Sequence, residues 1–71
     1  MKLSVGEKVK IIMDRQKITM TELAPKAGQS RQNLTNKISR GNFTEKDIET
    51  IAAALGCGVE IVFTLPDGEQ I

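Results

Sequence analysis

The sequence predicts a mainly α-helical domain in which four short helices are followed by one C-terminal β-strand. Two observations predict this fold. A Ser or Thr with N-capping spacing precedes an apolar helical pattern four times, and after residue 58 apolar residues recur at every second position. With 71 residues the chain forms a single domain, and its two Phe are the only aromatic residues, so the core must be aliphatic.

The first predicted helix covers residues 5–17 and follows a capping box. The Ser4 hydroxyl is placed to accept from a free N–H of the first turn, while Glu7 reaches back to the Ser4 N–H. An apolar stripe runs along the helix and consists of Val5, Val9, Ile12 and Met13.

The second predicted helix covers residues 20–27. It starts with another capping box, Thr19 with Glu22, and Gly28 closes it in the left-handed position. Pro25 lies inside it, where a proline removes one backbone hydrogen bond and crowds the preceding turn. We therefore expect this helix to be loosened or kinked.

The third predicted helix, 31–39, is capped by Ser30 and stopped by Gly41. Leu34 and Ile38 define its buried side. The rest of its surface carries no acidic residue and presents Arg31, Gln32, Asn33, Thr35, Asn36, Lys37 and Ser39. Gln and Asn can each form two hydrogen bonds with the edge of an adenine, and Arg can form two with the edge of a guanine. This surface is therefore typical of a helix that reads DNA. A solvated amphipathic helix is the alternative interpretation.

The fourth predicted helix, 45–55, begins after Thr44 and closes at Gly56. Its apolar side consists of Ile48, Ile51, Ala52 and Leu55.

The alternation after Gly58 predicts a strand over 59–65. A lone strand leaves an unpaired edge that invites pairing. We expect it to pair antiparallel with its copy in a second subunit and to serve as the dimerisation element, with contacts from Val59, Ile61 and Phe63. The alternative is a small intramolecular hairpin around Pro66-Asp67-Gly68.

The net charge of +1 conceals an uneven distribution. Residues 1–40 contain nine basic and three acidic residues, a charge of +6, whereas residues 41–71 contain one Lys and six acidic residues, a charge of −5. The basic part includes the second and third helices, so it can face phosphates while the acidic part stays away from them.

The composition argues against several classes of function. The chain has no His, the usual general base and commonest metal ligand, and its single Cys57 makes neither an intramolecular disulfide nor a zinc site. We therefore expect no enzyme activity, no cofactor and no metal. No apolar run approaches the roughly 18 residues of a membrane span, and residues 1–9 have no signal-peptide core, so we expect a cytoplasmic protein without membrane contacts.

Three stretches of the chain resemble the phage-repressor and Cro-like (XRE) helix-turn-helix family. They are Ile18-Thr19-Met20-Thr21-Glu22-Leu23-Ala24, Ala27-Gly28-Gln29-Ser30-Arg31-Gln32-Asn33-Leu34, and Gly41-Asn42. The resemblance covers about residues 5–55 and implies a four-helix repressor-like helix-turn-helix domain, as found in regulators of prophages and mobile elements. Gln29 departs from it, since the family commonly has a small apolar residue there.

The resemblance also implies roles for individual residues. The third helix would lie in the major groove, with base contacts from Arg31, Gln32, Thr35 and Asn36. Phosphate contacts would come from Thr21, Asn33, Lys37, Arg40 and Asn42. Backbone N–H groups at the start of the second helix would add to them.

Together these features predict a sequence-specific DNA-binding transcriptional regulator that acts as a homodimer on a palindromic operator in double-stranded DNA. The alternative is an antitoxin or anti-repressor that binds a second protein through the C-terminal strand.

Overall fold

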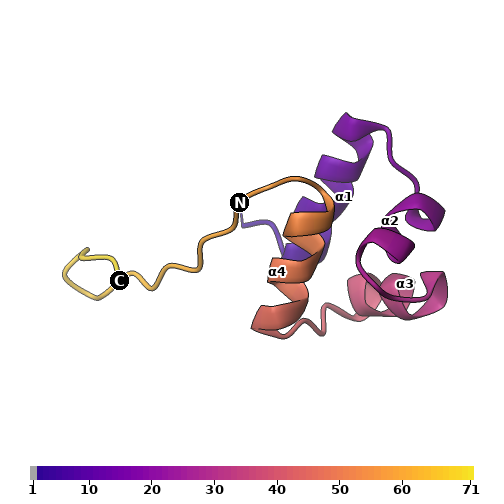
Figure 1. Cartoon of the computed structure of the whole chain (residues 1–71). Helices are drawn as coiled ribbons and strands as arrows, with labels where there is room; N and C mark the ends of the chain where they lie inside the picture. Colours follow the sequence, from indigo (N-terminus) through magenta and orange to yellow (C-terminus); the bar gives the residue numbers. More distant parts are fainter. Residues whose placement is uncertain (1) are drawn as a thin grey trace.

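Four α-helices begin directly after the Ser and Thr residues predicted to cap them (Figure 1). The computed structural model describes residues 2–71. In that part of the chain the helices are α1 (Val5–Gln16), α2 (Met20–Lys26), α3 (Arg31–Arg40) and α4 (Glu45–Ala54).

Reciprocal caps explain where α1 and α2 start. The Glu7 N–H donates to Ser4 Oγ at 3.2 Å, and the Ser4 N–H donates to Glu7 Oε1 at 2.9 Å. Thr19 and Glu22 repeat the arrangement in α2. In each box the capping residue's backbone N–H stabilises the carboxylate, which lowers the pKa of Glu7 and of Glu22 below the ordinary value.

The proline in α2 does not end the helix early. The helix continues through Pro25 to Lys26, and the Ala27 N–H then donates to the Leu23 and Ala24 carbonyl oxygens at 3.0 and 3.1 Å. Proline has no N–H to offer the preceding turn, but the helix has only seven residues and ends at Lys26, the residue after Pro25.

The core lies where α1, α2, α3 and α4 meet, and it is aliphatic as the composition requires. Leu23, Leu34 and Ile51 are its largest fully buried side chains. The complete cluster consists of Val9, Met13, Leu23, Ala24, Leu34, Ile38, Ile51 and Leu55. Every helix contributes to it, so the position of α3 depends on packing against the other three.

A glycine sets how closely α1 approaches α3. A Cβ atom placed on Gly6 would lie 2.8 Å from the carbonyl oxygen of Ile38, which is shorter than any ordinary contact. Because that oxygen belongs to the backbone, it cannot turn away as a side chain could. Any larger residue at position 6 would therefore push the two helices apart.

The C-terminal segment corrects the prediction of a continuous strand over 59–65. Within residues 2–71 no strand of a sheet forms; instead, Phe63 and Ile71 exchange two backbone hydrogen bonds of 2.8 and 2.9 Å. The alternative, an intramolecular hairpin around Pro66-Asp67-Gly68, is the arrangement observed.

The turn explains why this hairpin forms from so few residues. Gly68 has a φ of 93°, a value that favours glycine, and Asp67 Oδ1 accepts from the Glu69 N–H at 3.0 Å. The chain is thereby reversed, and Thr64 and Gln70 meet in an isolated antiparallel bridge.

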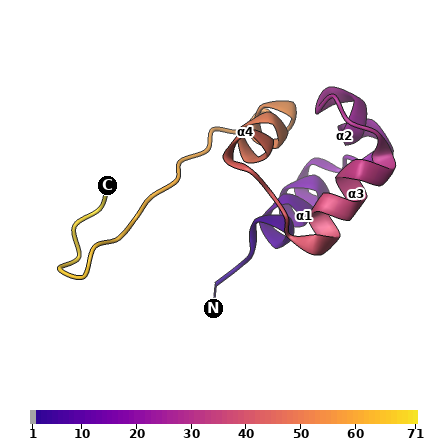
Figure 2. The same cartoon turned by 90° about the horizontal axis from the view of Figure 1, so that it is seen from below.

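We call residues 58–71 the arm, because they project from the helices (Figures 1 and 2). The projection makes the molecule elongated, 43 × 22 × 21 Å, with a radius of gyration of 13.2 Å. A compact chain of this length has a radius of gyration of about 11 Å. None of the helices in residues 2–71 has the length and apolar character needed to cross a membrane.

Candidate nucleic-acid interface

Helices α2 and α3 form a helix-turn-helix pair. The turn between them is fixed by the Gln29 N–H, which donates to the Ala24 carbonyl oxygen at 2.9 Å, and by Gly28, whose φ is 69°. Buried Leu23, Ala24 and Leu34 fill the space where the helices meet. Because the contact includes one alanine, the two helices pack closely around a short turn.

Helix α3 separates its apolar and polar residues sharply. Leu34 is fully buried and Ile38 is 6% exposed, so this side of the helix is anchored in the core. The four residues predicted to contact bases are all exposed, and together they line one shallow hollow on the surface: Arg31, Gln32, Thr35 and Asn36. The structure thus presents them as one continuous surface of four polar side chains.

Four of the five residues predicted to contact phosphates are also exposed. Asn33 and Arg40 lie on α3, Thr21 in the first turn of α2, and Asn42 just after α3. They are carried by different elements of the helix-turn-helix region. Three of the four are neutral side chains that can bind a phosphate only by hydrogen bonds, so Arg40 is the cation among them.

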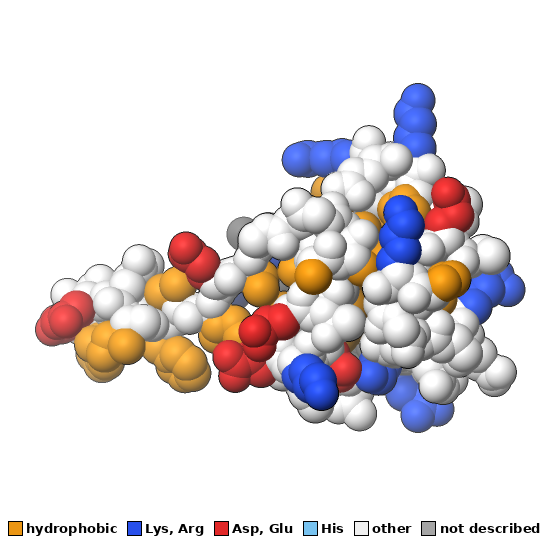
Figure 3. Space-filling view, viewed as in Figure 1, with side chains coloured by type: hydrophobic (Ala, Val, Ile, Leu, Met, Phe, Trp, Pro, Cys, Tyr) orange, Lys and Arg blue, Asp and Glu red, His pale blue; other side chains and the backbone are white. Residues whose placement is uncertain are grey.

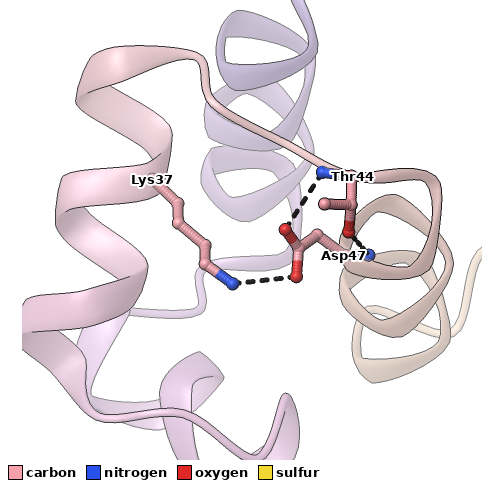
Figure 4. A network of polar contacts seen from close by, with 3 residues as sticks. All are labelled: Lys37, Thr44 and Asp47. Carbon is pink, nitrogen blue, oxygen red and sulfur yellow. Dashed lines mark hydrogen bonds and ion pairs between the residues drawn. The ribbon is translucent and has the colours of Figure 1, made fainter.

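Lys37, the fifth predicted phosphate contact, is different because its ammonium group is already paired. Its Nζ donates to Asp47 Oδ1 at 2.8 Å, while Asp47 Oδ2 accepts from the Thr44 N–H at 3.0 Å (Figure 4). The Lys37 ammonium, together with the Thr44 N–H, lowers the pKa of Asp47 from 3.8 to about 2. Lys37 therefore joins α3 to the N-terminus of α4, a role that the sequence did not indicate.

A carboxylate lies at the start of α2, where the resemblance implies that backbone N–H groups meet a phosphate. The Glu22 carboxylate accepts from the Thr19 N–H at 3.1 Å and from the Thr19 hydroxyl at 3.0 Å. A negative charge thus already complements the positive end of this helix, and it would repel a phosphate there. Thr21, in the same turn, has an exposed side chain.

One polar atom in the helix-turn-helix region is buried without a hydrogen bond. The side-chain oxygen of Gln29, at the position that departs from the family pattern, has no partner among the described residues. Such an atom is destabilising relative to a bonded one.

The helical body and the arm differ in net charge. The body carries all the Lys and Arg side chains together with six acidic ones, whereas the arm shows only Asp and Glu among its charged side chains (Figure 3). The arm contains three acidic residues and no basic one. Phosphates are therefore attracted to the helical body and repelled by the arm.

The described residues contain no group of three His, Cys, Asp or Glu side chains placed to hold a metal ion. Comparison with protein families gives a match over residues 8–67 to the Cro/C1-type HTH DNA-binding domain. No curated protein and no solved structure matches the chain.

Proposed function

The chain belongs to the Cro/C1-type helix-turn-helix family of DNA-binding domains, and we propose that it is a sequence-specific transcriptional regulator that reads the major groove with α3. The observation that carries this proposal is the exposed surface of α3. It has no acidic residue, and four of its exposed polar side chains lie side by side on a helix anchored by Leu34 and Ile38: Arg31, Gln32, Thr35 and Asn36.

The chemistry of these four side chains suggests which base edges they contact. The Arg31 guanidinium matches the two acceptors of guanine, and the amides of Gln32 and Asn36 match the donor and acceptor of adenine. The Thr35 methyl group suits the thymine methyl. A helix of this composition is suited to distinguish base pairs.

We assign the phosphate contacts to Thr21, Asn33, Arg40 and Asn42, which fix the register of α3 in the groove. For Lys37 we propose a positioning role, because its ammonium group is paired with Asp47. Its contribution to DNA binding then comes from the orientation of α3.

We further propose that the protein acts as a homodimer on a two-fold operator, with Val59, Ile61 and Phe63 in the dimer interface. These side chains are 42%, 49% and 72% exposed in the single chain, an unusual arrangement for apolar residues so close together. In such a dimer the two copies of α3 would be about 34 Å apart, or a multiple of that distance.

The same exposed arm supports a second candidate function, that of an antitoxin or anti-repressor whose arm binds another protein. Stoichiometric co-purification of a second polypeptide from the native host, lost on removal of the arm, would favour it. A purified protein that binds DNA alone as a homodimer would favour the first function.

The proposed DNA interface is tested by an NMR titration of the isotope-labelled protein with a random-sequence duplex. We expect the amide signals of residues 31–36 and 40–42 to shift, and those of the arm to stay in place. Shifts confined to the arm, or no shifts at low salt, would overturn the proposal.

A further inference from the structure

Lys17, which caps the C-terminus of α1, has a backbone conformation that side chains rarely adopt. Its φ is 55°, and it is the only residue other than glycine with a positive φ in the described part of the chain, residues 2–71. In this left-handed region the Cβ atom of a side chain comes too close to a backbone carbonyl oxygen. A lysine is therefore less favourable at position 17 than a glycine.

The other three helices end differently, because each has a glycine in the left-handed position. This residue follows the cap of α2 and of α4 and is itself the cap of α3. The three glycines are Gly28, Gly41 and Gly56, with φ values of 69°, 67° and 70°. Only α1 has a long, charged side chain at the equivalent position.

The corner between α1 and α2 is well fixed, so the conformation of Lys17 does not result from a loose connection. The Lys17 N–H donates to the Asp14 carbonyl oxygen at 3.2 Å, and the Ile18 N–H donates to the Met13 carbonyl oxygen at 3.0 Å. Ile18 is half-buried and packs against the core. These contacts hold the backbone in the left-handed conformation at position 17.

The side chain of Lys17 makes no ionic contact within the fold. It is exposed, and the only ion pair within residues 2–71 joins Lys37 to Asp47. A cation does stabilise the C-terminal end of a helix, but Arg15 already lies in the last turn of α1. The fold itself therefore gives little reason for a lysine in a strained position.

Lys17 is close in the chain to residues of the proposed DNA interface. It precedes Thr19, the cap of α2, by two residues and the exposed Thr21 by four, and the connection leads directly into the helix-turn-helix pair (Figure 1). The start of α2 carries the Glu22 carboxylate, which repels a phosphate. The cation assigned to the interface, Arg40, lies at the C-terminal end of α3. A phosphate near Thr21 thus needs a cation from a neighbouring element.

We propose that Lys17 is that cation and binds the DNA phosphate that Thr21 contacts. Its ammonium group offsets the charge of the Glu22 carboxylate, so that a phosphate can approach the start of α2. The left-handed lysine is retained because a glycine, although better for the backbone, would supply no charge. This inference rests on the proposed DNA binding and adds a residue to its interface.

Three variants at position 17 test the proposal by fluorescence anisotropy with a random-sequence duplex. Lys17→Gly and Lys17→Asn remove the charge and suit the left-handed backbone, whereas Lys17→Arg keeps the charge. One phosphate contact contributes about 0.9 to the slope of log affinity against log salt concentration. Raising the salt from about 50 mM to about 200 mM should therefore weaken binding by Lys17→Gly and Lys17→Asn about 3.5-fold less than binding by the unmodified protein. Lys17→Arg should behave like the unmodified protein.

Melting temperatures show whether a change in binding comes from a change in the fold. Lys17→Gly relieves the backbone at position 17, so it should melt at the same temperature as the unmodified protein or higher. Lys46→Ala is the matched control, since it removes an exposed cation from α4, outside the proposed interface. It should leave the salt slope unchanged.

Three results would overturn the proposal. An unchanged salt slope in Lys17→Gly would show that Lys17 contacts no phosphate, and a slope reduced equally in Lys17→Arg would show that its charge is not involved. A lower melting temperature of Lys17→Gly would show that Lys17 serves as a cap of α1. In each case the amide shifts of residues 31–36 in the unmodified protein would leave the proposed function intact, whereas absence of those shifts at low salt would refute that function itself.

Discussion

The ammonium group of Lys37 lies 2.8 Å from Asp47 Oδ1, so an ion pair joins α3, the proposed recognition helix, to the first turn of α4. Asp47 also caps α4 through the Thr44 N–H, and both side chains are partly shielded from solvent. A single carboxylate thus both starts α4 and holds α3 against it.

The first prediction concerns the pH dependence of this contact. The pKa of Asp47 is lowered in the folded state, from 3.8 to about 2. Its ionised form therefore stabilises the fold above about pH 4, and this contribution is lost as the pH falls from 4 to 2. Asp47→Asn should lower the free energy of unfolding at pH 7, and the difference from the unmodified protein should disappear near pH 2.

Urea denaturation at several pH values measures this effect, with Glu49→Gln, an exposed carboxylate change on the same helix, as the control. If Asp47→Asn lowers the free energy of unfolding by the same amount at pH 2 and at pH 7, the Asp47 side chain acts through packing and not through its charge.

The second prediction separates Lys37 from Arg40. Each phosphate contact contributes about 0.9 to the slope of log affinity against log salt concentration. Because Lys37 is paired with Asp47, Lys37→Ala should destabilise the fold and leave this slope unchanged. Arg40→Ala should reduce the slope by about 1 and weaken binding to all sequences alike.

Fluorescence anisotropy at several salt concentrations measures both slopes. Lys46→Ala removes a cation outside the proposed interface and serves as the control. Equal losses of slope in Lys37→Ala and Arg40→Ala would show that Lys37 leaves Asp47 and contacts a phosphate in the complex.

The third prediction concerns base recognition by Gln32. Replacing Gln32 by Ala removes a two-point contact to one base, so binding to the preferred site should weaken by about 1–3 kcal/mol for that contact. Affinity for random DNA should stay the same. Competition binding with single-base variants of the site measures this, and Ser39→Ala on the same helix is the control. If Gln32→Ala lowers the affinity for preferred and for random DNA equally, Gln32 contacts a phosphate and not a base.

The fourth prediction tests the close approach of α1 and α3. Alanine normally favours a helix over glycine by about 1 kcal/mol. At position 6, however, the new Cβ would lie 2.8 Å from the Ile38 carbonyl oxygen, and such overpacking costs about 1–3 kcal/mol. Gly6→Ala should therefore lower the melting temperature.

Gly58→Ala is the matched control, since a Cβ there meets no atom within 4 Å and no positive φ has to be maintained. A Gly6→Ala variant more stable than the unmodified protein would show that α1 and α3 can separate without loss of packing.

Much of this fold could be predicted because its helix signals are local. The box formed by Ser4 and Glu7 lies within one turn, and the left-handed Gly41 directly follows α3. The polar face of α3 was equally predictable, since burial of Leu34 and Ile38 determines which residues face outward.

Other features could not be predicted because they depend on which distant residues meet. The need for Gly6 becomes visible only when Ile38 is placed against it, and the pairing of Lys37 depends on the angle between α3 and α4. The strand was predicted from its alternation alone. The turn residues Pro66-Asp67-Gly68 indicated the hairpin only as the alternative. The alternating pattern of 59–65 does not reveal that the three residues after the turn are sufficient to form it.

Selection of bound sequences from a random DNA library, at two salt concentrations, tests the central claim most directly. If α3 reads the major groove within a two-fold dimer, the selected sequences will share a palindromic motif, more sharply enriched at the higher salt where non-specific binding is weak. Selection with Gln32→Ala should lose one base preference in each half-site. Enrichment of no motif, or of the same motif by both proteins, would contradict the account.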